Sequence, residues 1–270
     1  MTTIVHGVMT AERRLEHMSF VTRLSGRFGQ DAVRLAIRLR TESDTPDKDA
    51  RLLEEGVPEG HVFGSMDICG LRIACERGVF TPRLSTIDLV WRAAQRSADV
   101  EFGRAPIVVD IGAGTGAIAL VLAAAVDATC IGIDIDTAAV DLARRNALAL
   151  SLENRTTFFV ADARGPEFAA LLPEADVVVC NPPYIPDRIR LPTDVVKNQP
   201  AAALYSGPDG MGLTGVCLRL GLSVVRPGGF LLLEHDPAQT GVVAALARRR
   251  GGWVADYARG GTTVLRREAS

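Results

Sequence analysis

From residue 107 to its end, the chain alternates short apolar segments with segments of helical length. The apolar segments are rich in large and β-branched residues, and they lie at residues 107–111, 129–133, 157–160, 177–181 and 229–233. Such runs are typical of strands that are buried on both faces, as in a parallel sheet. Because strands that alternate with helices form βαβ units, the pattern predicts an α/β fold with a doubly wound sheet.

A glycine-rich loop follows the first predicted strand. It reads Gly112-Ala113-Gly114-Thr115-Gly116. Glycines at such a place allow a tight turn and a close approach of the backbone to a ligand. The loop therefore predicts a nucleotide-containing cofactor.

Acidic residues follow the next two predicted strands. Asp134 ends the second strand, where a carboxylate can bind both ribose hydroxyls of an adenosine-containing cofactor. After the third strand, Asp162 is placed to accept from an adenine amino group, and the N–H of Ala163 to meet a ring nitrogen. Gly112, Gly114 and Ala117 also satisfy the dinucleotide fingerprint, and Asp134 is correctly placed for it, so the loop alone does not separate a nicotinamide cofactor from S-adenosylmethionine.

The fourth predicted strand is cut off by Asn181-Pro182-Pro183-Tyr184. Proline cannot donate a hydrogen bond to a sheet, so the strand must stop at Asn181. The prolines also stiffen the turn at the carboxyl end of the strand, which is where open α/β sheets bind ligands.

This corner suits methylation of a planar nitrogen, whose delocalised lone pair is a poor nucleophile. The side-chain carbonyl of Asn181 and the main-chain carbonyl of Pro182 can accept both N–H hydrogens of the substrate, while Tyr184 lies against its flat face. Rate then comes from positioning and from acceptors aimed at the charge that develops on nitrogen. We predict Asn181, Pro182, Pro183 and Tyr184 as the catalytic residues.

Composition excludes several classes of function. The net charge of −2 and the scarcity of lysine give no strong nucleic-acid signal. The five cysteines have no C-x-x-C spacing and are predicted to be buried and reduced, and the four histidines form no ligand cluster, so no metal site is predicted. The chain has no apolar stretch long enough to span a bilayer and no signal-peptide pattern, so we expect a cytoplasmic protein.

Three regions are predicted along the chain. Residues 1–60 are arginine-rich with helical spacing of apolar residues, and we expect a helical substrate-docking region or lid. Residues 61–84 predict a β-hairpin linker with Gly70 at its turn. Residues 85–270 form the domain with the parallel sheet, and Gly260-Gly261 near its end predicts a terminal antiparallel hairpin. That hairpin and the Asn-Pro-Pro-Tyr segment favour S-adenosylmethionine over a nicotinamide cofactor.

From about residue 50 to its end, the chain resembles the HemK/PrmC family of S-adenosylmethionine-dependent protein-glutamine methyltransferases, which modify peptide-chain release factors. The resemblance rests on Phe80-Thr81-Pro82-Arg83-Leu84-Ser85-Thr86, on the segment from Val109 to Leu120, on Asn181-Pro182-Pro183-Tyr184-Ile185, and on Ala203-Leu204 with Gly207, Asp209 and Gly210.

The resemblance implies a Rossmann-like doubly wound seven-stranded sheet with a C-terminal antiparallel hairpin and a small N-terminal helical region. It implies cofactor contacts at Asp110, Gly112, Ala113, Gly114, Thr115, Gly116, Asp134, Asp162, Ala163 and Asn181. The glutamine side-chain amide of a release factor or another protein would be the methyl acceptor.

The chain departs from the family pattern at two places. Ile87 stands where an acidic residue is usual, and Ala163 stands where an aromatic residue is common. A small-molecule or nucleic-acid amine is therefore kept as an alternative substrate, and a non-catalytic binding module and a nicotinamide oxidoreductase as alternative functions. Trp91 is predicted to pack in the core, and Glu234-His235-Asp236 to pack beside the cofactor or face solvent.

Overall fold

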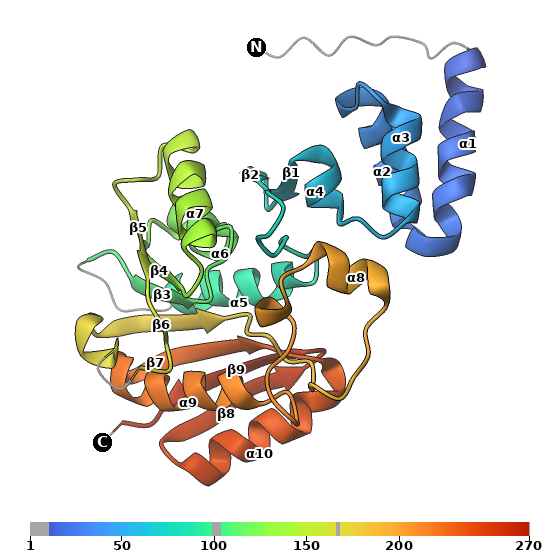
Figure 1. The fold of residues 1–270 in the computed structure, drawn as a ribbon. Coiled ribbons are helices and arrows are strands. Elements are labelled where there is room, and N and C mark those ends of the chain that lie inside the picture. Colours follow the sequence, from blue (N-terminus) through green and yellow to red (C-terminus); the bar gives the residue numbers. More distant parts are fainter. Residues whose placement is uncertain (1–10, 99–103, 166–167, 270) are drawn as a thin grey trace.

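The computed structural model describes residues 11–98, 104–165 and 168–269. A seven-stranded sheet with the order β5-β4-β3-β6-β7-β9-β8 forms its centre (Figure 1). The strands are β3 (Ile107–Ile111), β4 (Thr129–Asp134), β5 (Thr156–Val160), β6 (Ala175–Cys180), β7 (Val225–Glu234), β8 (Trp253–Arg259) and β9 (Thr262–Arg267). Strands β3 to β7 pair in parallel, and β9 is antiparallel to β7 and β8. The predicted doubly wound sheet with a terminal antiparallel hairpin is confirmed.

Helices cover both faces of the sheet. Val177 and Val179 of β6 face a core shared with α5 (Thr86–Ala98), α6 (Ala117–Val126) and α7 (Thr137–Ala149). Val178 and Cys180 face the other core, which α9 (Gly212–Val224) and α10 (Thr240–Arg250) close. Successive residues of a strand point to opposite faces, so a strand between two helical layers must be apolar throughout. This explains the unbroken apolar run of β6.

The order of the strands reverses beside β3. Its two neighbours are β4 and β6, and Ile111 at the end of β3 pairs with Cys180 at the end of β6. The glycine-rich loop after β3 and Asn181 after β6 are therefore adjacent at the carboxyl edge of the sheet. Ligands of open α/β sheets bind at such a switch point.

The N-terminal region consists of α1 (Ala11–Phe28), α2 (Asp31–Glu42), α3 (Pro46–Glu54) and α4 (Glu59–Phe63), followed by a hairpin of β1 (Ser65–Ile68) and β2 (Leu71–Ala74). Helices α1 to α3 stand apart from the sheet, with the hairpin between them (Figure 1). They enclose an apolar cluster of their own that includes Leu24, Leu35 and Leu53. The part of the predicted helical region at residues 1–10 lies outside the described residues.

Further short elements complete the chain. They are α8 (Thr193–Asn198) and three 3₁₀ turns, η1 (Phe168–Leu171), η2 (Ala201–Ala203) and η3 (Pro237–Gln239). Helix α8 lies between the N-terminal helices and the sheet (Figure 1), and its Asp194 pairs with Arg27 of α1. None of the helices in the described ranges is long and apolar enough to cross a membrane.

Two predictions about packing are wrong. Trp91 is 54% exposed, because α5 turns Leu89, Val90 and Ala93 to the sheet and residue 91 falls on the opposite side of the helix. Cys69 is exposed at the tip of the β1–β2 hairpin, whereas Cys75, Cys130, Cys180 and Cys217 are buried and free as predicted.

A buried carboxylate joins three strands at the amino edge of the sheet. Asp176 of β6 accepts from the Ile107 N–H at 2.8 Å, from Arg104 Nη1 at 2.6 Å and from Arg226 Nε at 2.6 Å. Burial alone would raise the pKa of Asp176, but these hydrogen bonds outweigh it and hold the pKa below its usual value.

Asp176→Asn is expected to lower the free energy of unfolding by about 3 kcal/mol at pH 7, because it breaks a buried pair. A group with a depressed folded pKa stabilises above its unfolded pKa, so this difference should shrink as the pH falls below about 4. Urea unfolding at pH 7 and pH 3 measures it. Asp141→Asn, which breaks an exposed pair with Arg144, is the control and should cost less than about 0.5 kcal/mol. Equal midpoints for Asp176→Asn and wild type at pH 7 would refute the role of Asp176.

Candidate active site

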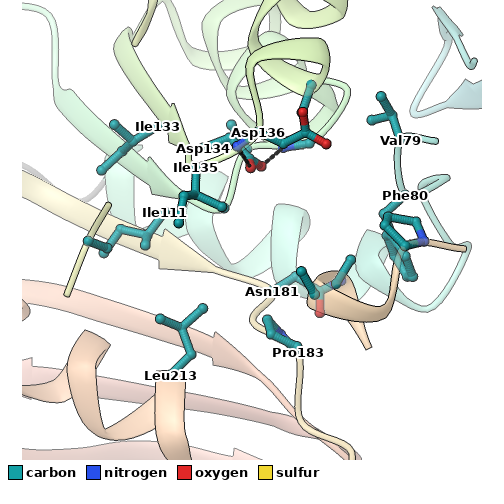
Figure 2. Close-up of a pocket in the computed structure, with 18 of the residues that line it drawn as sticks. Val79, Phe80, Ile111, Ile133, Asp134, Ile135, Asp136, Asn181, Pro183 and Leu213 are labelled. Atoms are coloured by element: carbon teal, nitrogen blue, oxygen red, sulfur yellow. Dashed lines mark hydrogen bonds between the residues drawn. The ribbon is translucent and has the colours of Figure 1, made fainter. Parts of the chain in front are cut away.

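A cavity of about 510 Å³ opens at the carboxyl ends of β3, β4 and β6 (Figure 2). In Figure 2, Asp134 and Asp136 lie on one side of the space and Asn181, Pro183 and Leu213 on another. The predicted site residues on its wall are Gly112, Ala113, Gly114, Thr115, Asp134, Asp162, Ala163, Asn181 and Pro183. Most of the predicted cofactor residues thus meet at one cavity, although they come from four strand ends.

The glycine-rich loop is held by the neighbouring strand. The N–H groups of Gly112 and Ala113 both donate to the carbonyl of Ile133 at 2.8 Å. Gly112 and Gly114 have φ values of +76° and +54°, which side chains rarely adopt. A Cβ on Gly112 would meet no atom of the described residues within 4 Å. The loop therefore presents bare backbone to open space, as close approach of a ligand requires.

Asp134 is the carboxylate nearest this loop. Its Oδ2 accepts from the Gly114 N–H at 2.9 Å and its Oδ1 from the Asp136 N–H at 3.0 Å, drawn as dashed lines in Figure 2. Burial raises its pKa, and the two N–H donors act against that shift. Each oxygen keeps a lone pair, so the group can still accept from a diol.

Asp162 is exposed and forms an ion pair with Arg164. Arg164 donates to it through Nε at 2.8 Å and Nη2 at 2.9 Å, and the guanidinium lowers the pKa of the carboxyl. Both side chains line the cavity. Asp162 can therefore accept from a ligand only alongside Arg164.

Two predicted cofactor residues lie behind the cavity wall. Asp110 is fully buried, and its Oδ2 accepts from the Ala119 N–H at 3.2 Å. Burial raises its pKa to about 7. Gly116 is buried against Ala143 and Phe158. Asp110 and Gly116 are not part of the cavity wall, because Asp110 is turned toward α6 and Gly116 packs on α7, and their contact with cofactor stays a prediction.

Asn181 reaches the cavity from the end of β6. Its Nδ2 donates to Thr86 Oγ1 at 3.2 Å, so the carbonyl end of the amide is turned away from Thr86. Pro183 also lines the cavity, whereas Pro182 is buried and is not part of that wall.

Tyr184 lies outside the cavity wall and is half-buried. Burial raises the pKa of its phenol, and Glu234 and Asp236 act in the same direction, against Arg83. The main-chain carbonyl of Tyr184 accepts from Gln239 Nε2 at 2.8 Å, which anchors the proline turn to η3. The Tyr184 ring is thus within reach of the charges of Arg83, Glu234 and Asp236 and outside the cavity wall.

In the Glu234-His235-Asp236 segment, Glu234 and His235 are buried and Asp236 is exposed, and none of the three is part of the cavity wall. His235 is buried, with Nδ1 2.9 Å from the Asp236 carbonyl and Nε2 2.8 Å from Thr263 Oγ1. Asp236 caps η3 by accepting from the Ala238 N–H. Glu234 is also buried, and the prediction of cofactor packing or solvent exposure is wrong for it and for His235.

Several residues that line the cavity were not predicted from the sequence to contact a ligand. They are Ile135, Ala139, Tyr205 and Leu213, together with Thr86 and Phe80, which were quoted only as part of a motif. Ile135 carried a signal, since it is a large apolar residue directly after the acid that ends a strand. For the others only the chain path brings them to the cavity.

The donor set of the cavity fits S-adenosylmethionine. The Asp134 carboxylate, which can accept from a ribose diol, borders the cavity together with bare glycine backbone, and Ile111, Ile133 and Ile135 add apolar surface suited to a flat base (Figure 2). A volume near 500 Å³ lies within the usual range for cofactor pockets.

Comparisons with known proteins agree with this geometry. A family model described as a methyltransferase domain matches residues 108–191. A 4-amino-L-phenylalanine/4-methylamino-L-phenylalanine methyltransferase of Streptomyces pristinaespiralis is 37% identical over 200 residues, which cover 73% of this chain and 67% of that protein.

Two further relatives carry the name release factor glutamine methyltransferase. The one from Rhodopirellula baltica is 34% identical over 205 residues, 74% of this chain and 68% of the relative. The one from Deinococcus radiodurans is 34% identical over 219 residues, 78% of this chain and 75% of the relative.

Solved structures support the fold. A T. thermophilus 16S rRNA methyltransferase in complex with AdoMet and guanosine aligns with a TM-score of 0.51 at 22% identity, over 76% of this chain and 50% of that one. The relatives at 34% and 37% identity, each covered to two thirds or more, show that the chain belongs to the HemK/PrmC family of S-adenosylmethionine-dependent methyltransferases.

Proposed function

We propose that this enzyme methylates the side-chain amide nitrogen of a glutamine in a peptide-chain release factor. One observation carries the proposal: the Asn181 amide lines the cavity while its Nδ2 is bonded to Thr86, which leaves the carbonyl end for a substrate. A carbonyl accepts an N–H, and an amide nitrogen is a target that must be held through its hydrogens.

Asn181 Oδ1 and the Pro182 carbonyl would accept the two N–H hydrogens of the target. Both acceptors belong to a turn that two prolines stiffen, so little conformational entropy is lost when they are aligned with the substrate. They stabilise the positive charge that develops on nitrogen, and no strong base is needed because the alkylated nitrogen is acidic. Tyr184 would lie against the flat face of the amide.

S-Adenosylmethionine supplies an electrophilic methyl group on its sulfonium. Asp134 would hold the ribose hydroxyls, and the backbone of Gly112 and Gly114 would border the rest of the cofactor. Asp162 and Ala163 would meet the base. These assignments are supported by the shared cavity wall.

The release factor is preferred because this name is carried by relatives whose length the alignment with this chain covers by two thirds or more. The second candidate is a small aromatic amine, supported by the Streptomyces pristinaespiralis relative at 37% identity. Both substrates present a planar N–H nitrogen, so the same two acceptors would serve either.

We further propose that residues 1–60 dock the protein substrate or act as a lid, and that residues 61–84 link them to the methyltransferase domain at residues 85–270. We also propose that the protein works in the cytoplasm. Contacts near the cavity support a coupled N-terminal region. Arg27 of α1 pairs with Asp194 of α8, and Gln199 just beyond α8 donates through Nε2 to Thr81 Oγ1 at 2.9 Å. Pro200, the next residue, lines the cavity.

The test is transfer of a labelled methyl group from S-adenosylmethionine to a purified bacterial release factor. The control is a release-factor variant whose glutamine in the Gly-Gly-Gln loop is replaced, and peptide mass locates the label. We expect one added methyl on that glutamine and none on the variant. Binding of S-adenosylhomocysteine without any transfer would refute the release factor as substrate, and transfer to 4-amino-L-phenylalanine in the same assay would favour the second candidate.

A further inference from the structure

A buried carboxyl group lies at the end of β7 beside the catalytic turn. Glu234 is 6% exposed, and its Oε1 accepts from Ser85 Oγ at 3.3 Å. Its Oε2 has no hydrogen-bond partner among the described residues. Burying a polar group without full partners costs free energy, so its position calls for an explanation.

The groups around Glu234 shift its pKa in opposite directions, and the result is a pKa above the usual value. Burial raises its pKa, and Asp88 adds to this shift. The hydroxyls of Thr86 and Ser85 and the charge of Arg83 lower it. The hydroxyls that favour the ionised form come from the start of α5, so the carboxylate is directed at that helix end.

Thr86 lies between Glu234 and Asn181. It is the first residue of α5, it is buried, and its Oγ1 accepts from Asn181 Nδ2 at 3.2 Å. A hydroxyl has one proton and two lone pairs. Since one lone pair is used by Asn181, the proton of Thr86 is available to the Glu234 carboxylate.

This arrangement gives the hydrogen-bond chain a direction. A side-chain amide can turn by 180° and exchange its donor for its acceptor, and a hydroxyl alone would accept either orientation. An ionised carboxyl can only accept. In that ionised form Glu234 accepts from the Thr86 hydroxyl, whose interaction lowers the pKa of the carboxyl, so that Thr86 accepts from Nδ2 and the oxygen of Asn181 is left on the opposite side.

We propose that Glu234, acting through Thr86, is the positioning residue that keeps Oδ1 of Asn181 turned toward the methyl-acceptor nitrogen. The inference rests on the proposed role of Asn181. With the amide reversed, Nδ2 would oppose the N–H groups of the substrate, and donor would face donor. The competing explanation is that Glu234 only ties the start of α5 to the sheet.

Thr86→Val tests the link, because it removes the hydroxyl and keeps the shape. We expect kcat for release-factor methylation to fall about 30-fold, less than the loss of a whole acceptor. The dissociation constant for S-adenosylhomocysteine should stay within about threefold, because valine keeps the shape of this one residue and the rest of the cavity wall is unchanged. Thr86→Ser should restore kcat to within about threefold of wild type. The matched control is Thr214→Val in α9, which removes a buried hydroxyl that has no partner among the described residues.

Glu234→Gln tests whether the carboxyl acts through Thr86. An amide offers Thr86 both a donor and an acceptor, so the direction is lost, and we expect kcat to fall about 10-fold. The double variant should be no slower than Thr86→Val alone, because both changes remove the same effect. Losses that multiply would overturn the inference.

Side-chain resonances of asparagine give a readout that needs no methyl acceptor. The chain has four asparagines, Asn146, Asn154, Asn181 and Asn198, so labelling with ¹⁵N-asparagine gives four NH₂ pairs, and Asn181→Asp identifies one of them. We expect this pair to shift or broaden in Thr86→Val and Glu234→Gln and to stay unchanged in Thr214→Val. An unchanged pair in the first two variants would overturn the inference.

Asn181→Ala measured in parallel separates the two hypotheses. If this variant keeps wild-type turnover, the proposed role of Asn181 fails. If it is inactive while Thr86→Val retains wild-type kcat, only the role of Glu234 and Thr86 fails, and Glu234 is an anchor for α5.

Discussion

Asn181→Ala is expected to lower kcat for methyl transfer by about 10³-fold, because it removes an acceptor aimed at the nitrogen on which charge develops. Asn181 lines the cavity at the carboxyl end of β6, and its neighbours Pro182 and Pro183 keep the turn rigid. The measurement is single-turnover transfer from labelled S-adenosylmethionine to release factor. The affinity for S-adenosylhomocysteine, measured by calorimetry, should weaken by less than about fivefold, because most of the cavity wall remains.

A matched variant separates chemistry from folding. Asn181→Asp keeps the size of the side chain and an acceptor but loses the N–H that donates to Thr86. We expect it to bind cofactor and to transfer at a rate between those of wild type and Asn181→Ala. Turnover of Asn181→Ala near the wild-type value would refute the proposed mechanism.

Asp134→Ala is expected to raise the dissociation constant for S-adenosylmethionine about 100-fold. The cofactor would lose two hydrogen bonds from its ribose to a charged acceptor, each worth about 1.5 kcal/mol. The loop would lose the hydrogen bond that the Gly114 N–H donates to Asp134. Calorimetry measures the change. Asp141→Ala is the control, since Asp141 is exposed, pairs with Arg144 and is not part of the cavity wall, and it should raise the dissociation constant less than about threefold.

The pH dependence of cofactor binding gives a second check. Burial raises the pKa of Asp134, so its carboxylate takes up a proton at a higher pH than an exposed aspartate does. The ionised form is the better acceptor, and affinity should therefore fall toward acidic pH in wild type. In Asp134→Ala this acid limb should disappear; an identical acid limb in both proteins would assign it to another group.

Local patterns of sequence predicted much of the site. The loop at residues 112–116 and the turn at residues 181–184 were recognisable because glycine and proline restrict the backbone in ways that neighbours do not change. Asp134 was predictable because a single acid ends a buried strand. Apolar runs of strand length revealed the parallel sheet, since both of its faces are covered.

The direction in which a side chain points was not predictable from the sequence. Asp110 and Asp134 both end or nearly end a strand, yet Asp110 is buried under α6 and Asp134 borders the cavity. Trp91 is apolar and helical, but its angular position on α5 turns it to solvent. A shift of one residue along a strand or helix turns a side chain from the buried to the exposed side, and composition alone does not determine that register.

The sequence by itself determined the class of fold and located the glycine-rich loop and the Asn-Pro-Pro-Tyr turn at the ends of their strands, because these depend on periodicity and on backbone restrictions within a few residues. Only the tertiary structure decided that Thr86 bonds Asn181 and that Glu234 lies at the start of the same helix. Asn181 and Thr86 are 95 positions apart, and Glu234 and Ser85 are 149 apart. The order of strands in the sheet, β6 beside β7 with α5 packed across them, is what brings a distant carboxylate to the start of a helix and gives an amide its direction.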